Sequence, residues 1–146
     1  MKLLTQSTPL ALWYEIIQEA ESKSGISLKQ DLESYLIFLL IRYIKRPDLL
    51  HQILATEFLT GLKHSQSKRI IVLQEVGDQC LLFSGLFPGI AERRLVKLSY
   101  YVNLGQSAYA GVSRIRNDLF SSLSHQFVRV MNVLQATREN DILKPD

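Results

Sequence analysis

The sequence predicts an all-α fold of about six helices, packed as a single bundle or orthogonal array over residues 1–146. Apolar residues recur at steps of three and four along most of the chain, which is the period of a helix with one buried face. Gly and Pro separate these segments where helices would stop and start. No segment alternates apolar and polar residues at every second position, the pattern that indicates a half-buried strand.

The first helix is predicted to begin at Pro9 and to end just before Gly25. Ser7 or Thr8 can accept a hydrogen bond from a free N–H at its start, and Pro9 lacks the N–H that would go unsatisfied there. Gly25 suits the left-handed conformation that commonly follows a helix. The residues expected on the buried face are Leu10, Trp13, Ile16, Ile17 and Ala20.

The second helix is predicted to begin at a capping box formed by Ser27 and Gln30, in which each residue satisfies an end N–H of the other. Pro47 ends it, because the residue before a proline avoids the helical conformation. Apolar side chains surround most of this helix, so we expect it to be central in the core. Its main stripe is Leu28, Leu32, Tyr35, Leu36, Leu39 and Tyr43, with Ile37, Phe38, Leu40 and Ile41 around the remaining face.

Two further helices are predicted over residues 47–59 and 67–84. Asp48 lies favourably near the positive end of the first, and Gly61 ends it. Gly77 interrupts the second helix at a cost of about 1 kcal/mol relative to Ala, and we interpret it as a point where another helix crosses closely. The buried face of this helix is expected to be Ile70, Leu73, Val76, Cys80 and Phe83.

The last two helices are predicted over residues 99–112 and 117–138, followed by a tail that frays. Ser99 is the expected cap of the first, whose small residues Gly105 and Ala108 allow close packing. The second carries a regular apolar series consisting of Leu119, Leu123, Phe127, Val130, Met131 and Leu134.

The composition favours a cytoplasmic protein that binds neither membrane nor nucleic acid. Cys80 is the single cysteine, which favours a reducing compartment. The start of the chain lacks the roughly 7–15 apolar residues of a signal peptide, and the longest apolar run, from Tyr35 to Ile41, is far shorter than the ~20 residues that cross a bilayer. The net charge is +3 and the sequence pI about 9.1. The basic residues that a nucleic-acid surface would have to gather are spread along the chain: Lys63, Lys68, Arg69, Arg93, Arg94, Lys97, Arg114 and Arg116.

The sequence predicts no metal and no cofactor. His51, His64 and His125 stand outside the H-E-x-x-H and E-x-x-H arrangements that bind metals on helices. One cysteine cannot form a cysteine-based zinc site, and we interpret Cys80 as a buried small hydrophobe rather than a reactive thiolate. Gly85 and Gly89 fit neither a dinucleotide-binding nor a phosphate-binding loop.

Two features are candidates for function. Asp78 lies in an apolar helix, so a buried carboxyl there needs Arg93, Arg94 or a tyrosine hydroxyl as its partner. Such a group is either an internal brace or a catalytic acid or base. The second feature is the group Glu92, Arg93, Arg94, Lys97, Tyr100 and Tyr101. Arg and Tyr favour interfaces and Arg binds phosphate or carboxylate, although an ordinary solvated connection has the same composition.

The segment from Gly77 to Pro88 reads GDQCLLFSGLFP, and residues 100–109 read YYVNLGQSAY. With the arginines between them, these segments resemble a family of uncharacterised bacterial all-helical proteins that share a GD-x-x-L-x-x-SG-x-FP run, then arginines, then YY-x-x-x-G-x-x-AY. The resemblance covers about a quarter of the chain and implies a bacterial cytoplasmic origin. It also implies that one set of residues forms either a shared site or a structural knot, namely Asp78, Arg93, Arg94, Tyr100, Tyr101 and Tyr109.

Three hypotheses of function follow. The first is a non-enzymatic helical interaction or regulatory module, which contacts a protein partner or a second copy through residues 88–101 or through the broad apolar helices. The alternative is an enzyme or a binder of a small anionic ligand, with Asp78 as acid, base or charge partner. Its anion would be held by Arg93, Arg94, Tyr101 and Tyr109. Nucleic-acid binding is the third, and the scattered basic residues disfavour it.

Overall fold

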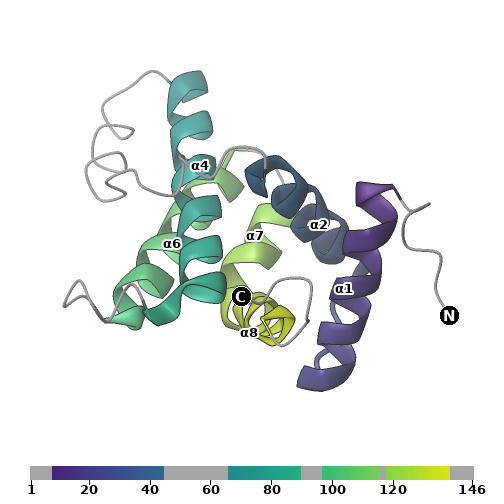
Figure 1. Ribbon diagram of the computed structural model, residues 1–146. Helices are drawn as coiled ribbons and strands as arrows, with labels where there is room; N and C mark the ends of the chain where they lie inside the picture. Colours follow the sequence, from purple (N-terminus) through teal and green to yellow (C-terminus); the bar gives the residue numbers. More distant parts are fainter. Residues whose placement is uncertain (1–7, 45–65, 90–96, 116–117, 139–146) are drawn as a thin grey trace, which may run out of the picture.

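Every element of the computed structural model is a helix in the part of the chain that it describes, residues 8–44, 66–89, 97–115 and 118–138. Six helices occupy these ranges (Figure 1): α1 (Pro9–Ser24), α2 (Gln30–Ile44), α4 (Gln66–Leu86), α6 (Leu98–Ser113), α7 (Asp118–His125) and α8 (Phe127–Thr137). The predicted all-α fold is therefore confirmed. The helix predicted over residues 47–59 lies outside the described residues.

The helix at the centre of the described part is α4. It packs most extensively against α6 and then against α8, whereas α2 packs mainly on α1 and α7. In Figure 1, α1 and α2 form the right-hand side of the molecule, and α8 lies between α1 and α4 at the bottom of the view. The prediction that the second helix is central is therefore wrong. Part of the apolar surface of α2 faces away from the core, since Phe38 on this helix is 60% exposed.

One hydrophobic core joins all six described helices. Burying a large aliphatic or aromatic side chain contributes about 1.5–3 kcal/mol, so this shared core holds the helices together. No described helix is long and apolar enough to cross a membrane. The largest fully buried apolar side chains are Ile17, Leu32, Leu36, Leu81, Leu82, Tyr109, Leu123, Phe127 and Leu134.

The two ends of α1 follow the predicted chemistry. Thr8 Oγ1 accepts a hydrogen bond of 3.1 Å from the backbone N–H of Ala11, and Pro9 is the first helical residue. Gly25 takes the left-handed conformation, with φ at 71°, and its N–H donates to the carbonyl of Glu21. Four of the five residues predicted to be buried are buried, but Leu10 is 47% exposed. Leu10 instead borders a groove between α1 and α2.

Two predicted helix starts are wrong. The second helix begins at Gln30, so Ser27 lies before its first turn, and the Ser27 carbonyl accepts a hydrogen bond from Arg129 of α8 at 3.3 Å. At the start of α2, Asp31 Oδ1 instead accepts from the N–H of Leu32. The helix predicted from Ser99 begins one residue earlier, at Leu98, and the preceding Lys97 makes no hydrogen bond to the helix start through its side chain. Neither Ser27 nor Ser99 therefore caps the helix that it was predicted to begin.

The single helix predicted over residues 117–138 is two helices. The chain leaves the helical conformation at Gln126, where φ is −104° and ψ is 19°. Polar side chains just before this point bond to backbone carbonyls, since His125 Nδ1 lies 2.8 Å from the Ser121 oxygen and Ser124 Oγ donates to the Gln106 oxygen of α6. Such bonds compete with regular helix geometry. They allow α8 to take a new direction after α7.

Candidate functional site

Asp78, Tyr35 and Tyr109 form a buried hydrogen-bonded group, the Asp78 cluster, at the junction of α4, α2 and α6. The hydroxyl of Tyr35 donates to Asp78 Oδ1 at 2.6 Å, and the hydroxyl of Tyr109 donates to the same oxygen at 2.7 Å. Gln74 Nε2 donates to the Tyr35 hydroxyl at 3.2 Å. Asp78 and Tyr109 are both 0% exposed. Among the predicted partners of Asp78, the tyrosine hydroxyls therefore occupy this role.

Aromatic packing connects the Asp78 cluster to two further helices, α7 and α8. The ring of Phe120 in α7 meets Tyr35 edge-on at 5.7 Å and lies 6.1 Å from Tyr109, and Phe127 of α8 lies 6.0 Å from Tyr109. A Cβ atom on Gly77 would lie 2.6 Å from the Tyr109 ring, so only glycine lets this ring approach α4. The interpretation of Gly77 as a close crossing is confirmed. The cluster thus connects five helices.

Burial controls the protonation of the Asp78 cluster. It raises the pKa of Asp78 to about 6, against hydrogen bonds from Tyr109 and Tyr35 that lower it. More weakly, Arg42 lowers the same pKa and Glu75 raises it. Burial and the negative charge of Asp78 raise the pKa values of both tyrosines, so their hydroxyls remain donors at neutral pH. Because Oδ1 accepts both donors and Oδ2 has no hydrogen-bond partner among the described residues, a proton on Asp78 sits on Oδ2.

The stability of the folded protein is expected to fall as pH rises from about 4 to about 6. Asp78 holds its proton up to a pKa of about 6 when folded but has an ordinary value of 3.8 when unfolded, so the folded state binds more protons in this window. The expected loss is on the order of 3 kcal/mol, at about 1.4 kcal/mol for each pH unit of difference. Urea unfolding at pH 4 to 7 measures it. Asp78→Asn should make this part of the profile less steep and leave the contribution of Glu21, whose pKa burial also raises, whereas parallel profiles for both proteins would contradict the assignment.

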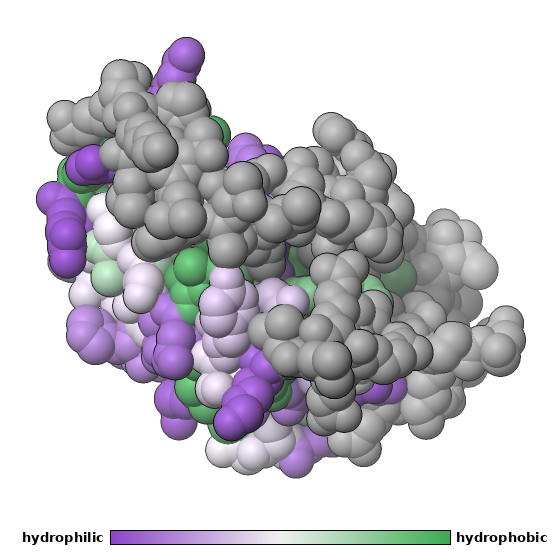
Figure 2. Space-filling model, turned by 90° about the vertical axis from the view of Figure 1, so that its left-hand side faces the viewer, coloured by the Kyte–Doolittle hydropathy of each residue, from purple (hydrophilic) through white to green (hydrophobic). Residues whose placement is uncertain are grey.

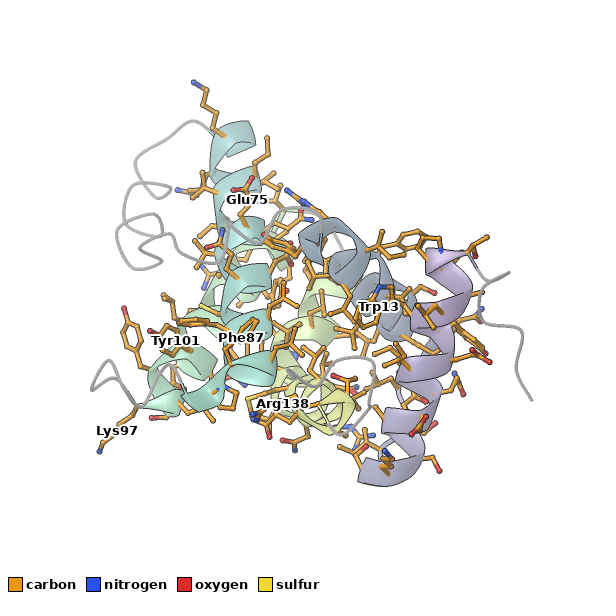
Figure 3. The ribbon with its side chains drawn as sticks, viewed as in Figure 1. Trp13, Glu75, Phe87, Lys97, Tyr101 and Arg138 are labelled. Atoms are coloured by element: carbon orange, nitrogen blue, oxygen red, sulfur yellow. The ribbon has the colours of Figure 1, made fainter. Side chains whose placement is uncertain are left out.

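Of the other predicted site residues, the two that the structure describes, Tyr100 and Tyr101, do not join the Asp78 cluster. Tyr101 is buried and packs edge-on against Phe83 at 5.0 Å and against Tyr100 at 5.4 Å, while Tyr100 is 42% exposed. Tyr101 and Tyr109 are eight residues apart on α6, which is about 12 Å along a helix. Figure 3 shows Lys97 pointing away from the helices. Arg93 and Arg94 lie outside the described residues.

A carboxyl pair between α1 and α2 was not indicated by any sequence pattern. Gln18 Nε2 donates to Glu33 Oε2 at 2.7 Å, and the carboxyl of Glu21 is hydrogen-bonded to that of Glu33. Burial, this hydrogen bond and the charge of Glu33 raise the pKa of Glu21 to about 7. Glu21 therefore keeps its proton up to about neutral pH and can donate it in the hydrogen bond to Glu33. The three-residue spacing of Gln18 and Glu21 places them on one side of α1, but the sequence does not show that Glu33 meets them.

An open groove of about 760 Å³ lies between α1 and α2, and Glu33 is part of its wall. Leu10, Tyr14 and Phe38 line it with 47%, 50% and 60% of their surfaces exposed. On the side of the molecule where α4 and α6 lie, hydrophilic and hydrophobic described residues are interspersed (Figure 2). The complete lining is Thr8, Leu10, Ala11, Tyr14, Glu15, Leu28, Gln30, Glu33, Ser34, Ile37 and Phe38. The sequence carried no direct signal for this groove, since the apolar character of Phe38 was interpreted as additional core surface.

Neither metal ligands in the described residues nor similarity to known proteins identifies a function for this chain. Within the described ranges, no group of three or more His, Cys, Asp or Glu side chains could hold a metal ion. Cys80 is fully buried, and burial raises the pKa of its thiol, in agreement with a small core residue. Comparison with protein-family models, curated proteins and solved structures finds no match to this chain. The family resemblance drawn from the GD and YY motifs therefore stays a prediction.

Proposed function

We propose that this protein is a non-enzymatic helical interaction module, and that the groove between α1 and α2 is its docking surface. The observation that carries the proposal is the exposure of three large apolar side chains, Leu10, Tyr14 and Phe38, around one groove. Fully burying side chains of this size is worth about 1.5–3 kcal/mol each. Apolar groups gathered in one place and rimmed by polar residues are typical of an interaction surface.

The shape of the groove favours a helix as its occupant. Its lining on α2 follows the helical steps from Gln30 through Glu33, Ser34 and Ile37 to Phe38, a length of about 12 Å or two turns. The opposite wall comes from the first two turns of α1. A groove between two helices accepts the apolar face of a third helix, whose anchoring side chains recur at steps of three, four and seven. We assign it to an amphipathic helix of a partner protein.

Burial disfavours the alternative, an enzyme or small-anion binder built on Asp78. Asp78 and Tyr109 have no exposed surface through which a ligand could reach them, and Oδ1 already accepts two hydroxyls. Tyr101 packs in a separate aromatic group. The geometry supports the Asp78 cluster as an internal brace. We also propose that the module acts in the cytoplasm, because its single cysteine is buried and unpaired.

A selection of helical peptides displayed without bias in charge tests the docking function. Peptides enriched on the wild-type protein are expected to carry apolar residues at helical spacing and to lose binding to the variant Tyr14→Ser/Phe38→Ser. Both side chains are at least half exposed, so the variant should fold. The matched control is Ile71→Ser/Val128→Ser, which removes two apolar residues that are 56% and 43% exposed outside the groove lining. Enriched peptides that bind all three proteins equally would refute the docking function.

A further inference from the structure

The ionisable residues of the groove are acidic, although the chain as a whole is basic. Of the eleven lining residues, Glu15 and Glu33 are the two acidic ones, and the lining holds neither Lys nor Arg. The net charge of the chain is +3. The groove therefore presents negative charge next to its apolar surface, against the sign of the protein's overall charge.

The structure fixes Glu33 in position before any partner arrives. Its Oε2 accepts a hydrogen bond of 2.7 Å from Gln18, and its carboxyl is hydrogen-bonded to Glu21. Glu33 as a whole is only 9% exposed. A carboxylate that is held and partly withdrawn from water interacts more strongly with a cation than a freely solvated one does.

Building on the proposed docking function, we infer that the partner helix is cationic, with Lys or Arg flanking its apolar anchors and reaching Glu15 and Glu33. Charge complementarity separates this occupant from a second copy of the chain. A symmetric dimer through the groove would place the same surface patch on both sides, and so bring two acidic linings without Lys or Arg into one interface. Like charges facing each other across an interface oppose association, whereas a basic helix meets the groove with opposite charge.

Two synthetic amphipathic peptides with the same leucine face test this inference by titration calorimetry. One carries Lys at all flanking positions and the other carries Glu. The Lys peptide is expected to bind at least about tenfold more tightly than the Glu peptide at low salt. This difference in affinity should shrink at roughly 0.5 M salt, because screening weakens exposed ion pairs. Glu15→Gln/Glu33→Gln should weaken the Lys peptide by about three- to tenfold. Glu19→Gln, which changes an α1 residue outside the lining, is the matched control and should leave binding unchanged.

The outcomes separate the inference from the proposed function. If both peptides bind equally and both lose binding to Tyr14→Ser/Phe38→Ser, the groove is a docking surface but the partner is not selected by charge. If the charge-neutral double variant binds the Lys peptide as tightly as the wild type does, Glu15 and Glu33 do not recognise it. Light scattering adds a third result, since a wild-type dimer that Tyr14→Ser/Phe38→Ser dissociates would make a second copy the occupant and overturn the cationic assignment.

Discussion

At pH 4, Asp78→Leu is expected to lower the free energy of unfolding by on the order of 2–6 kcal/mol, because each of two buried hydroxyls left without a partner costs about 1–3 kcal/mol. Leucine offers no acceptor to Tyr35 and Tyr109, whose hydroxyls both donate to Asp78 Oδ1. The measurement belongs at pH 4 because the folded carboxyl, with a pKa of about 6, is then neutral, and the unfolded carboxyl, with an ordinary pKa of 3.8, is close to half protonated. The cost of taking up a proton on folding is then less than about 1 kcal/mol, so it changes the comparison little. Urea unfolding followed by circular dichroism gives the difference.

Two phenylalanine variants separate the hydrogen bonds of the Asp78 cluster. Tyr35→Phe and Tyr109→Phe each remove one donor and leave the other on Oδ1, so each should cost about 1 kcal/mol. Tyr109→Phe keeps the ring that packs against Phe127, which limits the change to the hydroxyl. If Asp78→Leu and both phenylalanine variants unfold at the same urea concentration as the wild type, the hydrogen bonds contribute nothing and Asp78 is not a brace.

Helix ends that depend on local chemistry were predictable from the sequence. Thr8 caps the next turn through its own hydroxyl and Gly25 supplies a conformation that few other residues adopt, so neither needs knowledge of the rest of the fold. Ser27 and Ser99 have the same capping chemistry but do not cap helices. In the folded chain, the Ser27 carbonyl instead accepts a hydrogen bond from Arg129, which is 102 residues away in sequence. A local pattern cannot reveal a contact of that separation.

In the candidate sites, too, local chemistry was predictable from the sequence and contacts between distant residues were not. The sequence established that Asp78 would need a partner if it were buried, since an unpaired charge in an apolar helix is costly. It could not select Tyr35 and Tyr109, which lie 43 and 31 residues away in sequence, over the nearer arginines. Phe38 presents the opposite case, because its apolar character predicted burial and the packing of α1 against α2 leaves it 60% exposed. The groove is therefore a tertiary property with no sequence motif of its own.

The position of Tyr109 beside Asp78 depends on how closely α6 approaches its neighbours, and Gly105→Ala is expected to disturb that approach. A Cβ atom on Gly105 would lie 2.5 Å from the ring of Phe127 and 2.9 Å from Cys80 Cβ. Phe127 and Cys80 are both fully buried, so relieving the clash requires the helices to move apart. Overpacking of this kind costs about 1–3 kcal/mol. On the same helix, a Cβ at Gly111 meets only Leu73 within contact distance, and its nearest atom is the flexible Cδ1 end at 2.8 Å.

Gly111→Ala is therefore the matched control. Both replacements gain the same ~1 kcal/mol of helix propensity, so the difference between their free energies of unfolding isolates the clash and should be about 1–3 kcal/mol. Adding Phe127→Leu to Gly105→Ala should recover part of this difference, because the smaller side chain leaves room for the new methyl group. Equal stability of the two alanine variants would mean that α6 can move away from α4 and α8 without cost. The close crossing at Gly105 would then not be what holds Tyr109 against Asp78.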